Sequence, residues 1–250
     1  MTKFFNTIEN TNKAFPFFSE LHIIPLLIVL AGSYAIITNV DSLKKEKNRR
    51  IFMISIGILM LSQQILLYTW YNMSSIGFLK DGLPLYLSRI TSISIVIAFL
   101  TNKKSLNFII FFIGSLGSVI ALSIPDTSGY VFPHIMYIQF FTIHGCMFLA
   151  TLFLFFVDNY RPDKNEFKKI IKFIIAYSII ISFINGFLGA NYGYLEHPPA
   201  SAKIFDLLPP GIIYKLGITA VMCSLMTIIY ILFRKIPTES KFKLSIPFSN

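Results

Sequence analysis

Two side chains in this sequence have the chemistry needed to attack an ester, the hydroxyl of Ser88 and the imidazole of His144. A serine hydroxyl is too weak a nucleophile unaided, whereas a neutral imidazole can take its proton and later return it to the leaving alcohol. Because the two residues lie in separate apolar stretches, they form a nucleophile and general base only if those stretches pack together. The alternative for His144 is a neutral histidine that is hydrogen-bonded to a neighbouring helix.

The residues next to Ser88 and in the outer loops are candidates for substrate binding. Arg89 directly follows Ser88, near the start of its apolar stretch. An arginine at the centre of a membrane costs about 2.5–3.5 kcal/mol, so we expect Arg89 to be shallow, with its guanidinium reaching the outer headgroup layer. There it would hold a lipid phosphate. The other candidates are Tyr86, His22 near the outer boundary, and Asn191 as an oxyanion donor.

The elements that position these residues are seven apolar stretches, each about long enough to span a membrane as a helix. The chain has 54% hydrophobic residues and a mean hydropathy of +0.66, which is typical of an integral membrane protein. We therefore predict an all-α polytopic membrane helix bundle that forms one integral membrane domain over residues 1–250. The predicted spans are 21–40, 51–71, 83–101, 105–124, 132–157, 169–188 and 211–233.

The basic residues predict the orientation of this bundle. Seven spans place the main clusters of lysine and arginine on one side, which the positive-inside rule assigns to the cytoplasm. The N-terminus is then outside, the C-terminus is cytoplasmic, and Trp70 and Tyr71 fall at the outer interface, where an aromatic belt is expected. These clusters comprise Lys44, Lys45, Lys47, Arg49, Arg50, Lys103, Lys104, Arg161, Lys164, Lys168, Lys169, Lys172, Arg234, Lys235, Lys241 and Lys243.

The same distribution bears on partners and cofactors. The net charge of +10 reflects loops beside anionic lipid rather than a nucleic-acid surface. Cys146 and Cys223 lie in separate apolar stretches and do not have metal-site spacing, so we expect packing roles for both. We expect a membrane lipid as the substrate and predict no nucleic acid, no metal and no cofactor. The oligomeric state is left open.

Several sequence blocks, in this order and across nearly the whole chain, resemble the YwaF family of bacterial integral membrane proteins. The blocks are SELHII, LPLYLS, GSLGSVIALSIPD, FPHIMYIQFFTIHG, RPDKNEF, NGFLGANYGYLEHPP and LLPPGIIYKL. That family is similar to a eukaryotic transmembrane acyltransferase family that remodels ether phospholipids, and more remotely to the androgen-induced hydrolases of fatty-acid esters. The resemblance implies a multi-pass protein of the bacterial plasma membrane.

The resemblance also implies roles for particular residues. The relatives carry acyl transfer on a cysteine or threonine near the start of one helix and on a histidine of a later helix. Their nucleophile motif, Leu-Pro-Leu-His-Leu-Cys, aligns with residues 83–88, so Ser88 stands for the cysteine and Tyr86 for the histidine. The later histidine aligns with His144. Because serine is a poorer nucleophile than a thiolate near neutral pH, Ser88 depends more heavily on its base.

These observations predict a lipid acyltransferase or ester hydrolase that acts at the outer leaflet through Ser88 and His144. Two other classes fit the same sequence. One is a transporter or small-molecule-binding membrane protein, in which the polar residues line a cavity. The other is a family member that has kept the fold and lost its activity together with the cysteine.

Overall fold

The fold is known from a computed structural model that describes residues 3–6, 15–74, 77–199 and 207–236. Lys241 and Lys243 of the predicted cytoplasmic tail lie outside the described residues. Six helices in the described part are long and apolar enough to cross a membrane, and a seventh apolar helix is shorter. The six are α1 (Glu20–Thr38), α3 (Glu46–Met73), α5 (Asn107–Ser123), α6 (Ile135–Phe156), α7 (Lys164–Leu188) and α8 (Ile212–Phe233), and the shorter helix is α4 (Leu87–Thr101).

Short helical pieces lie at the N-terminus and in the connections, namely η1 (Lys3–Phe5), α2 (Val40–Leu43), the π-helix η2 (Phe78–Gly82), η3 (Lys104–Leu106) and η4 (Tyr192–Tyr194). The prediction of a polytopic all-helical bundle is confirmed for the described residues. The helix bounds agree with the predicted stretches to within five residues. Helices α3 and α7 begin five residues earlier than predicted, whereas α4 begins four residues later, at Leu87 instead of residue 83.

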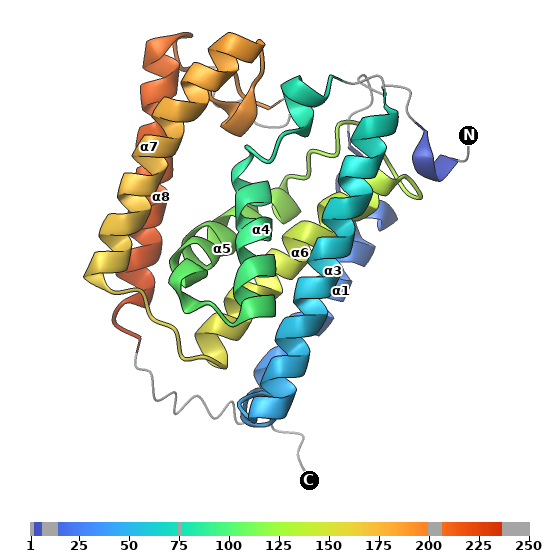
Figure 1. Cartoon of the computed structure of the whole chain (residues 1–250), viewed down its shortest axis with the longest axis vertical. Coiled ribbons are helices and arrows are strands. Elements are labelled where there is room, and N and C mark those ends of the chain that lie inside the picture. The colour runs from blue at the N-terminus through green and yellow to red at the C-terminus, as the bar shows by residue number, and fades with distance from the viewer. Residues whose placement is uncertain (1–2, 7–14, 75–76, 200–206, 237–250) are drawn as a thin grey trace.

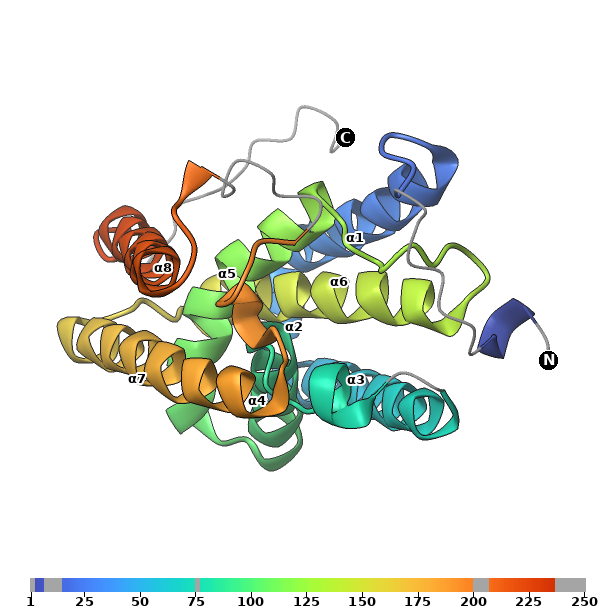
Figure 2. The ribbon, with the colours of Figure 1, turned by 90° about the horizontal axis from the view of Figure 1, so that it is seen from above.

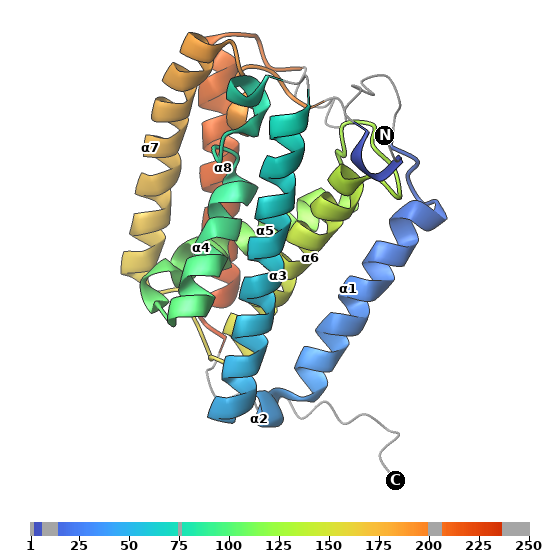
Figure 3. The same ribbon diagram turned by 45° about the vertical axis from the view of Figure 1, so that its right-hand side comes forward.

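Helix α6 is the centre of the bundle (Figures 1 and 2). It contacts α1, α3, α4 and α5, while α7 and α8 pack on each other and on α5. Of the six long helices it is the most buried, at 67% of its apolar window. Figure 3 shows α1 at the periphery of the bundle, at an angle to α3.

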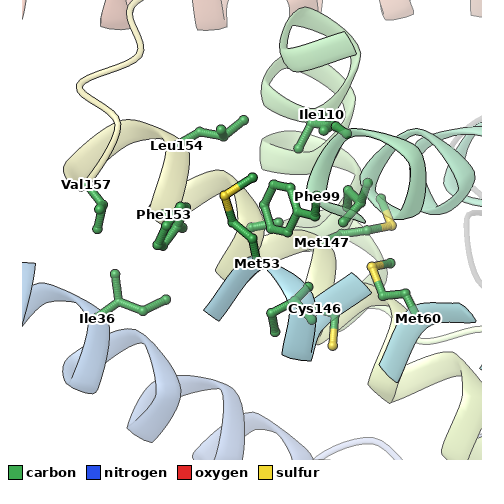
Figure 4. Close-up of a cluster of buried hydrophobic side chains, with 14 of the residues drawn as sticks. Ile36, Met53, Met60, Phe99, Ile110, Cys146, Met147, Phe153, Leu154 and Val157 are labelled. Atoms are coloured by element: carbon green, nitrogen blue, oxygen red, sulfur yellow. The ribbon is translucent and has the colours of Figure 1, made fainter. Parts of the chain in front are cut away.

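The largest apolar cluster surrounds α6 at the level where α1, α3, α4 and α5 meet it (Figure 4). Met147, Ala150 and Phe153 are fully buried there, and the ring of Phe52 stacks on Phe153 with centroids 4.4 Å apart. Because helices in a bilayer gain little from hydrophobic burial, such close packing is a main source of bundle stability. The cluster therefore fixes α4 and α6, which carry Ser88 and His144, against each other.

Arginines join the loops at the end of the bundle that carries the basic residues. Arg49 forms a two-pronged ion pair with Asp158, at 2.7 and 3.0 Å. Arg50 donates to the carbonyl oxygens of Phe99 and Leu100 at the end of α4, at 2.8 and 2.7 Å, which satisfies two carbonyls that a helix end leaves open. These bonds anchor the far end of α4, at the end of the bundle that the positive-inside rule predicts to face the cytoplasm.

Trp70 and Tyr71 are not part of an interfacial belt, so that prediction is wrong. Both side chains are almost fully buried, at 0% and 2% exposed. The indole N–H of Trp70 donates to the carbonyl oxygen of Asn6, which brings the N-terminal segment over the outer end of α3. A neighbouring histidine, His134, also bonds this carbonyl oxygen at 2.8 Å, so the segment is held by two side chains.

A substitution at Gly114 of α5 can test the close packing of α4, α5 and α6. A Cβ atom at this position would lie 2.7 Å from Oγ1 of Thr151, closer than real Cβ atoms come. We expect Gly114→Leu to destabilise the protein by about 1–3 kcal/mol through overpacking. Gly186→Leu is the matched control, because nothing lies within 4 Å of a Cβ atom there. Thermal unfolding in detergent should show a lower Tm for Gly114→Leu only; equal values would contradict the packing.

His134 makes the stability of the folded protein depend on pH. At the start of α6 its Nδ1 accepts the N–H of Met136, so Nε2 carries the proton that Asn6 accepts, and burial lowers the pKa of His134. As the pH drops through about 6.5, His134 gains a second ring proton in the unfolded chain before it does so in the folded protein. The free energy of unfolding therefore falls as the pH drops through that value.

His134→Asn keeps an acceptor at the start of the helix without the titration. Between about pH 7.5 and pH 5.5, the wild-type Tm in detergent should fall by more than that of His134→Asn. Parallel curves for the two proteins would show that His134 does not contribute.

Candidate active site

A cavity of about 870 Å³ opens between α4, α5, α6 and α8. Its polar lining comes from the loops at the outer end of the bundle and from the adjoining helix ends. The rest is apolar, with α5 and α8 facing each other. Ile120 and Ile124 belong to this wall and are each 46% exposed, so the cavity also reaches the lipid-facing surface. The polar lining includes Asp81, Tyr86, Ser88, Arg89, Asp126, Gln139, His144 and Tyr194.

Ser88 lies in the first turn of α4 and lines the cavity. Its hydroxyl has no hydrogen-bond partner among the described residues. The other four hydroxyl side chains of this helix are all engaged. Thr91, Ser94 and Thr101 each donate to the carbonyl four residues earlier, and Ser92 accepts from Gln64. The Ser88 hydroxyl is therefore available to a molecule in the cavity.

The start of α4 also leaves backbone donors next to Ser88. Ile90 is the first residue whose N–H bonds back to the turn, to the carbonyl oxygen of Tyr86. The N–H groups of Leu87, Ser88 and Arg89 have no acceptor among the described residues, as is usual in the first turn of a helix. With the helix dipole, such N–H groups favour negative charge. They can stabilise an oxyanion formed beside the Ser88 hydroxyl.

His144 of α6 is half-buried and lines the same cavity. Its Nδ1 lies 2.8 Å from the carbonyl oxygen of Phe140, one turn earlier in the helix. A carbonyl only accepts, so Nδ1 carries the proton, and in the neutral ring Nε2 has the free lone pair. No described residue bonds to Nε2. The imidazole is thus fixed in the tautomer that a general base needs.

Gly114 of α5 shows that Ser88 and His144 are at the same height. A Cβ atom on Gly114 would lie 3.8 Å from Cγ2 of Thr91 in α4 and 3.5 Å from the carbonyl oxygen of Met147 in α6. Helices α4 and α6 run in the same direction, and each candidate lies three residues before its contact residue. Both are therefore about 4.5 Å further toward the outer end. Two residues from different helices thus line one cavity at one level.

Arg89, which was expected to reach the headgroup layer, has a guanidinium that bonds within the protein. Its side chain is only 8% exposed and turns back over the loop before α4. One terminal nitrogen donates to the carbonyl oxygens of Asp81 and Leu83 at 2.5 and 2.9 Å, and the other donates to the hydroxyl of Tyr71 at 2.9 Å. These bonds stop the loop from continuing α4 outward, and with Pro84 they explain why the helix begins late.

Asp81 completes this cluster, although no pattern in the sequence selects it. Its carboxylate accepts from the hydroxyls of Tyr71 and Tyr86, both at 2.6 Å. Burial and the adjacent carboxylate raise the pKa of Tyr86, so the phenol stays protonated and donates. The guanidinium of Arg89 lies over both rings, 5.2 and 5.0 Å from their centroids. Tyr86 lines the cavity as a wall of this cluster.

Two predicted substrate-binding residues lie outside the cavity lining. His22 bonds through Nε2 to the carbonyl oxygen of Leu122, at 2.8 Å, and accepts the N–H of Phe18. Asn191 folds its own loop, with its oxygen accepting the N–H of Glu196 and its amide nitrogen bonding to the carbonyl oxygen of His197. Neither is placed to contact a substrate there. No group of three or more metal-ligating side chains occurs among the described residues.

The fold and this cavity define a multi-pass helical membrane protein with one amphipathic cavity near its outer end. The model of the TMEM164 family matches residues 17–230, which include six of the seven apolar helices, α8 up to Tyr230, and both candidate residues. The chain therefore belongs to the TMEM164 family. No curated protein and no solved structure matches the sequence.

Arg89 can be tested as the residue that holds the start of α4. Lysine keeps the charge but lacks the planar fork, so Arg89→Lys loses at least one of the three charged hydrogen bonds, each worth about 1.5–3 kcal/mol. We expect a clear drop in Tm in detergent. Arg234→Lys at the exposed end of α8 is the control and should melt like the wild type. A drop in neither variant would contradict the role of Arg89.

Proposed function

We propose that this protein transfers acyl groups from membrane lipids, with Ser88 as the nucleophile and His144 as the general base. The observation that carries the proposal is the pair itself: a hydroxyl and an imidazole, both without a partner on the reacting atom, line one amphipathic cavity at one height. The resemblance to the ether-phospholipid acyltransferases, made through residues 83–88 and His144, supports the same chemistry. The site would face the outer leaflet of the bacterial plasma membrane.

The reaction has two halves. Oγ of Ser88 attacks the ester carbonyl while Nε2 of His144 takes the hydroxyl proton, and the N–H groups at the start of α4 stabilise the oxyanion. The bond to the lipid alcohol then breaks, the alcohol leaves with the proton from Nε2, and the acyl group stays on Ser88. An incoming hydroxyl gives its proton to Nε2 and takes the acyl group, and Ser88 recovers its proton. Water as acceptor gives hydrolysis, and a lipid alcohol gives transfer.

Arg89 acts in this proposal as a positioning residue. Its guanidinium holds the loop at Asp81 and Leu83, which keeps the first turn of α4 open toward the cavity. The tyrosines Tyr177 and Tyr192 support the same loop, by donating to the carbonyl oxygen of Leu85 and accepting the N–H of Leu83. A lipid phosphate is therefore not needed to explain the arginine beside Ser88.

The test is covalent labelling of the purified full chain by a fluorophosphonate. Oγ of Ser88 attacks phosphorus and fluoride leaves, with the proton passing to His144. We expect labelling of the wild type, none of Ser88→Ala, and a rate lower by about 10²–10⁴ in His144→Ala. Ser94→Ala is the matched control, because Ser94 lies in the same helix and bonds to the carbonyl oxygen of Ile90 instead of lining the cavity.

Labelling that persists in Ser88→Ala, or a folded wild type that is not labelled, would contradict the proposal. Once labelling is established, mass spectrometry of vesicles containing the protein separates the two reactions. Hydrolysis releases free fatty acid, whereas transfer moves the acyl chain to another lipid without releasing it.

A second candidate is binding or transport of a small molecule. The specific observation in its favour is the interrupted third span, since irregular backbone at membrane depth is tolerated where it lines a cavity. A folded wild type that is not labelled by the fluorophosphonate would favour this class.

A further inference from the structure

Gly117 of α5 is a glycine that packing does not require. Glycine destabilises a helix interior relative to alanine, so a buried glycine in a helix usually has a neighbour that leaves no room for a side chain. Such a neighbour exists at four other helical glycines, where a Cβ atom would meet a side chain of another helix at 3.2 Å or less: Gly32, Gly57, Gly114 and Gly145.

No such neighbour exists at Gly117. A Cβ atom there would have one contact within 4 Å, the Cγ2 atom of Ile113 one turn earlier in the same helix, at an ordinary 3.7 Å. The backbone does not require glycine either, since Gly117 lies in regular helix without a positive φ. Gly117 lines the cavity, so the missing side chain leaves space in the cavity itself.

The position of this space relates it to the candidate pair. Gly117 lies three residues beyond Gly114 toward the outer end, and Ser88 and His144 lie three residues beyond the residues that Gly114 contacts. All three are therefore at one level. The space at Gly117 therefore lies on the α5 side of the cavity, at about the level of the candidate pair.

The wall on either side of Gly117 is apolar. Leu116 precedes it and Ile120 and Ala121 follow it along α5, and α8 presents Val221 and Met222 among its lining residues. A hydrocarbon chain is the part of a lipid that gains from such a wall. The wall continues to the half-exposed Ile120 and Ile124, so a chain can extend toward the surrounding lipid.

We propose that Gly117 determines which acyl groups the site accepts, because the chain of a long acyl group passes over this residue as it leaves the carbonyl. The inference rests on the proposed function and adds its substrate class: long-chain acyl groups, admitted by the absence of a side chain at residue 117. A larger residue there would restrict the site to short acyl groups.

The experiment compares the labelling rates of two fluorophosphonates, one with a hexadecyl chain and one with an ethyl group, on the detergent-purified full chain. The wild type should react faster with the hexadecyl probe. In Gly117→Leu we expect the ratio of the hexadecyl rate to the ethyl rate to fall at least about tenfold, the scale on which apolar pockets discriminate by size. Gly186→Leu, on the far face of α7, is the matched control and should keep the wild-type ratio.

Gly117→Ala guards against misfolding of the leucine variant, since alanine fits at this position and should lower the ratio in the same direction by a smaller amount. An unchanged ratio in folded Gly117→Leu, or an equal loss of both rates, would overturn the role of Gly117 and leave the proposed function standing. A wild type that neither probe labels would remove both proposals. A wild type that prefers the ethyl probe would overturn the long-chain assignment alone.

Discussion

The hydrogen bonds of Arg89 are the constraint on which the rest of the site depends. With 15 residues, α4 is about 22 Å long and falls short of the hydrocarbon thickness of about 30 Å. The chain covers the difference with a loop whose carbonyl oxygens need partners, since exposed backbone polar groups are costly in lipid. Arg89 supplies them at Asp81 and Leu83. An arginine in an apolar stretch thus satisfies the backbone carbonyl groups that an interrupted helix leaves open.

Because α4 begins late, at Leu87, the hydroxyl of Ser88 lies in the first turn of the helix. In the middle of a longer helix, its hydroxyl would bond to the carbonyl four residues earlier, as Thr91 and Ser94 do. In the first turn no helical carbonyl is available, and the adjacent N–H groups are open. The same interruption that exposes the hydroxyl therefore supplies donors for negative charge beside it. These surroundings suit the proposed role of Ser88 as a nucleophile, because the reactivity of a serine depends on its surroundings.

Features that depend on neighbouring residues were predicted from the sequence, whereas features that depend on contacts between distant segments were not. Hydropathy identified the seven helices, because membrane spans depend on local composition. The contacts of Arg89, Trp70 and Tyr71 were not predicted, because their partners lie mainly in the N-terminal segment and in the π-helix and loop before α4, and local sequence carries no information on such contacts. His22 and Asn191 were selected by residue type, whereas their actual partners are mostly backbone groups. Gly117 left no signal, because a glycine needed for packing and one that leaves space look alike in sequence.

The cavity wall that α8 contributes differs from the rest of the site. Only 17% of the apolar window of α8 is buried, against 67% for α6, which carries His144. His144 is therefore held by the most buried of the six long helices, while the facing wall belongs to a helix that packs mainly on α7 and α5. Local packing density governs how easily a region opens. In the proposed reaction, α8 is therefore the wall that yields most easily to a lipid, while α6 keeps His144 in place, so access and geometry depend on different parts of the bundle.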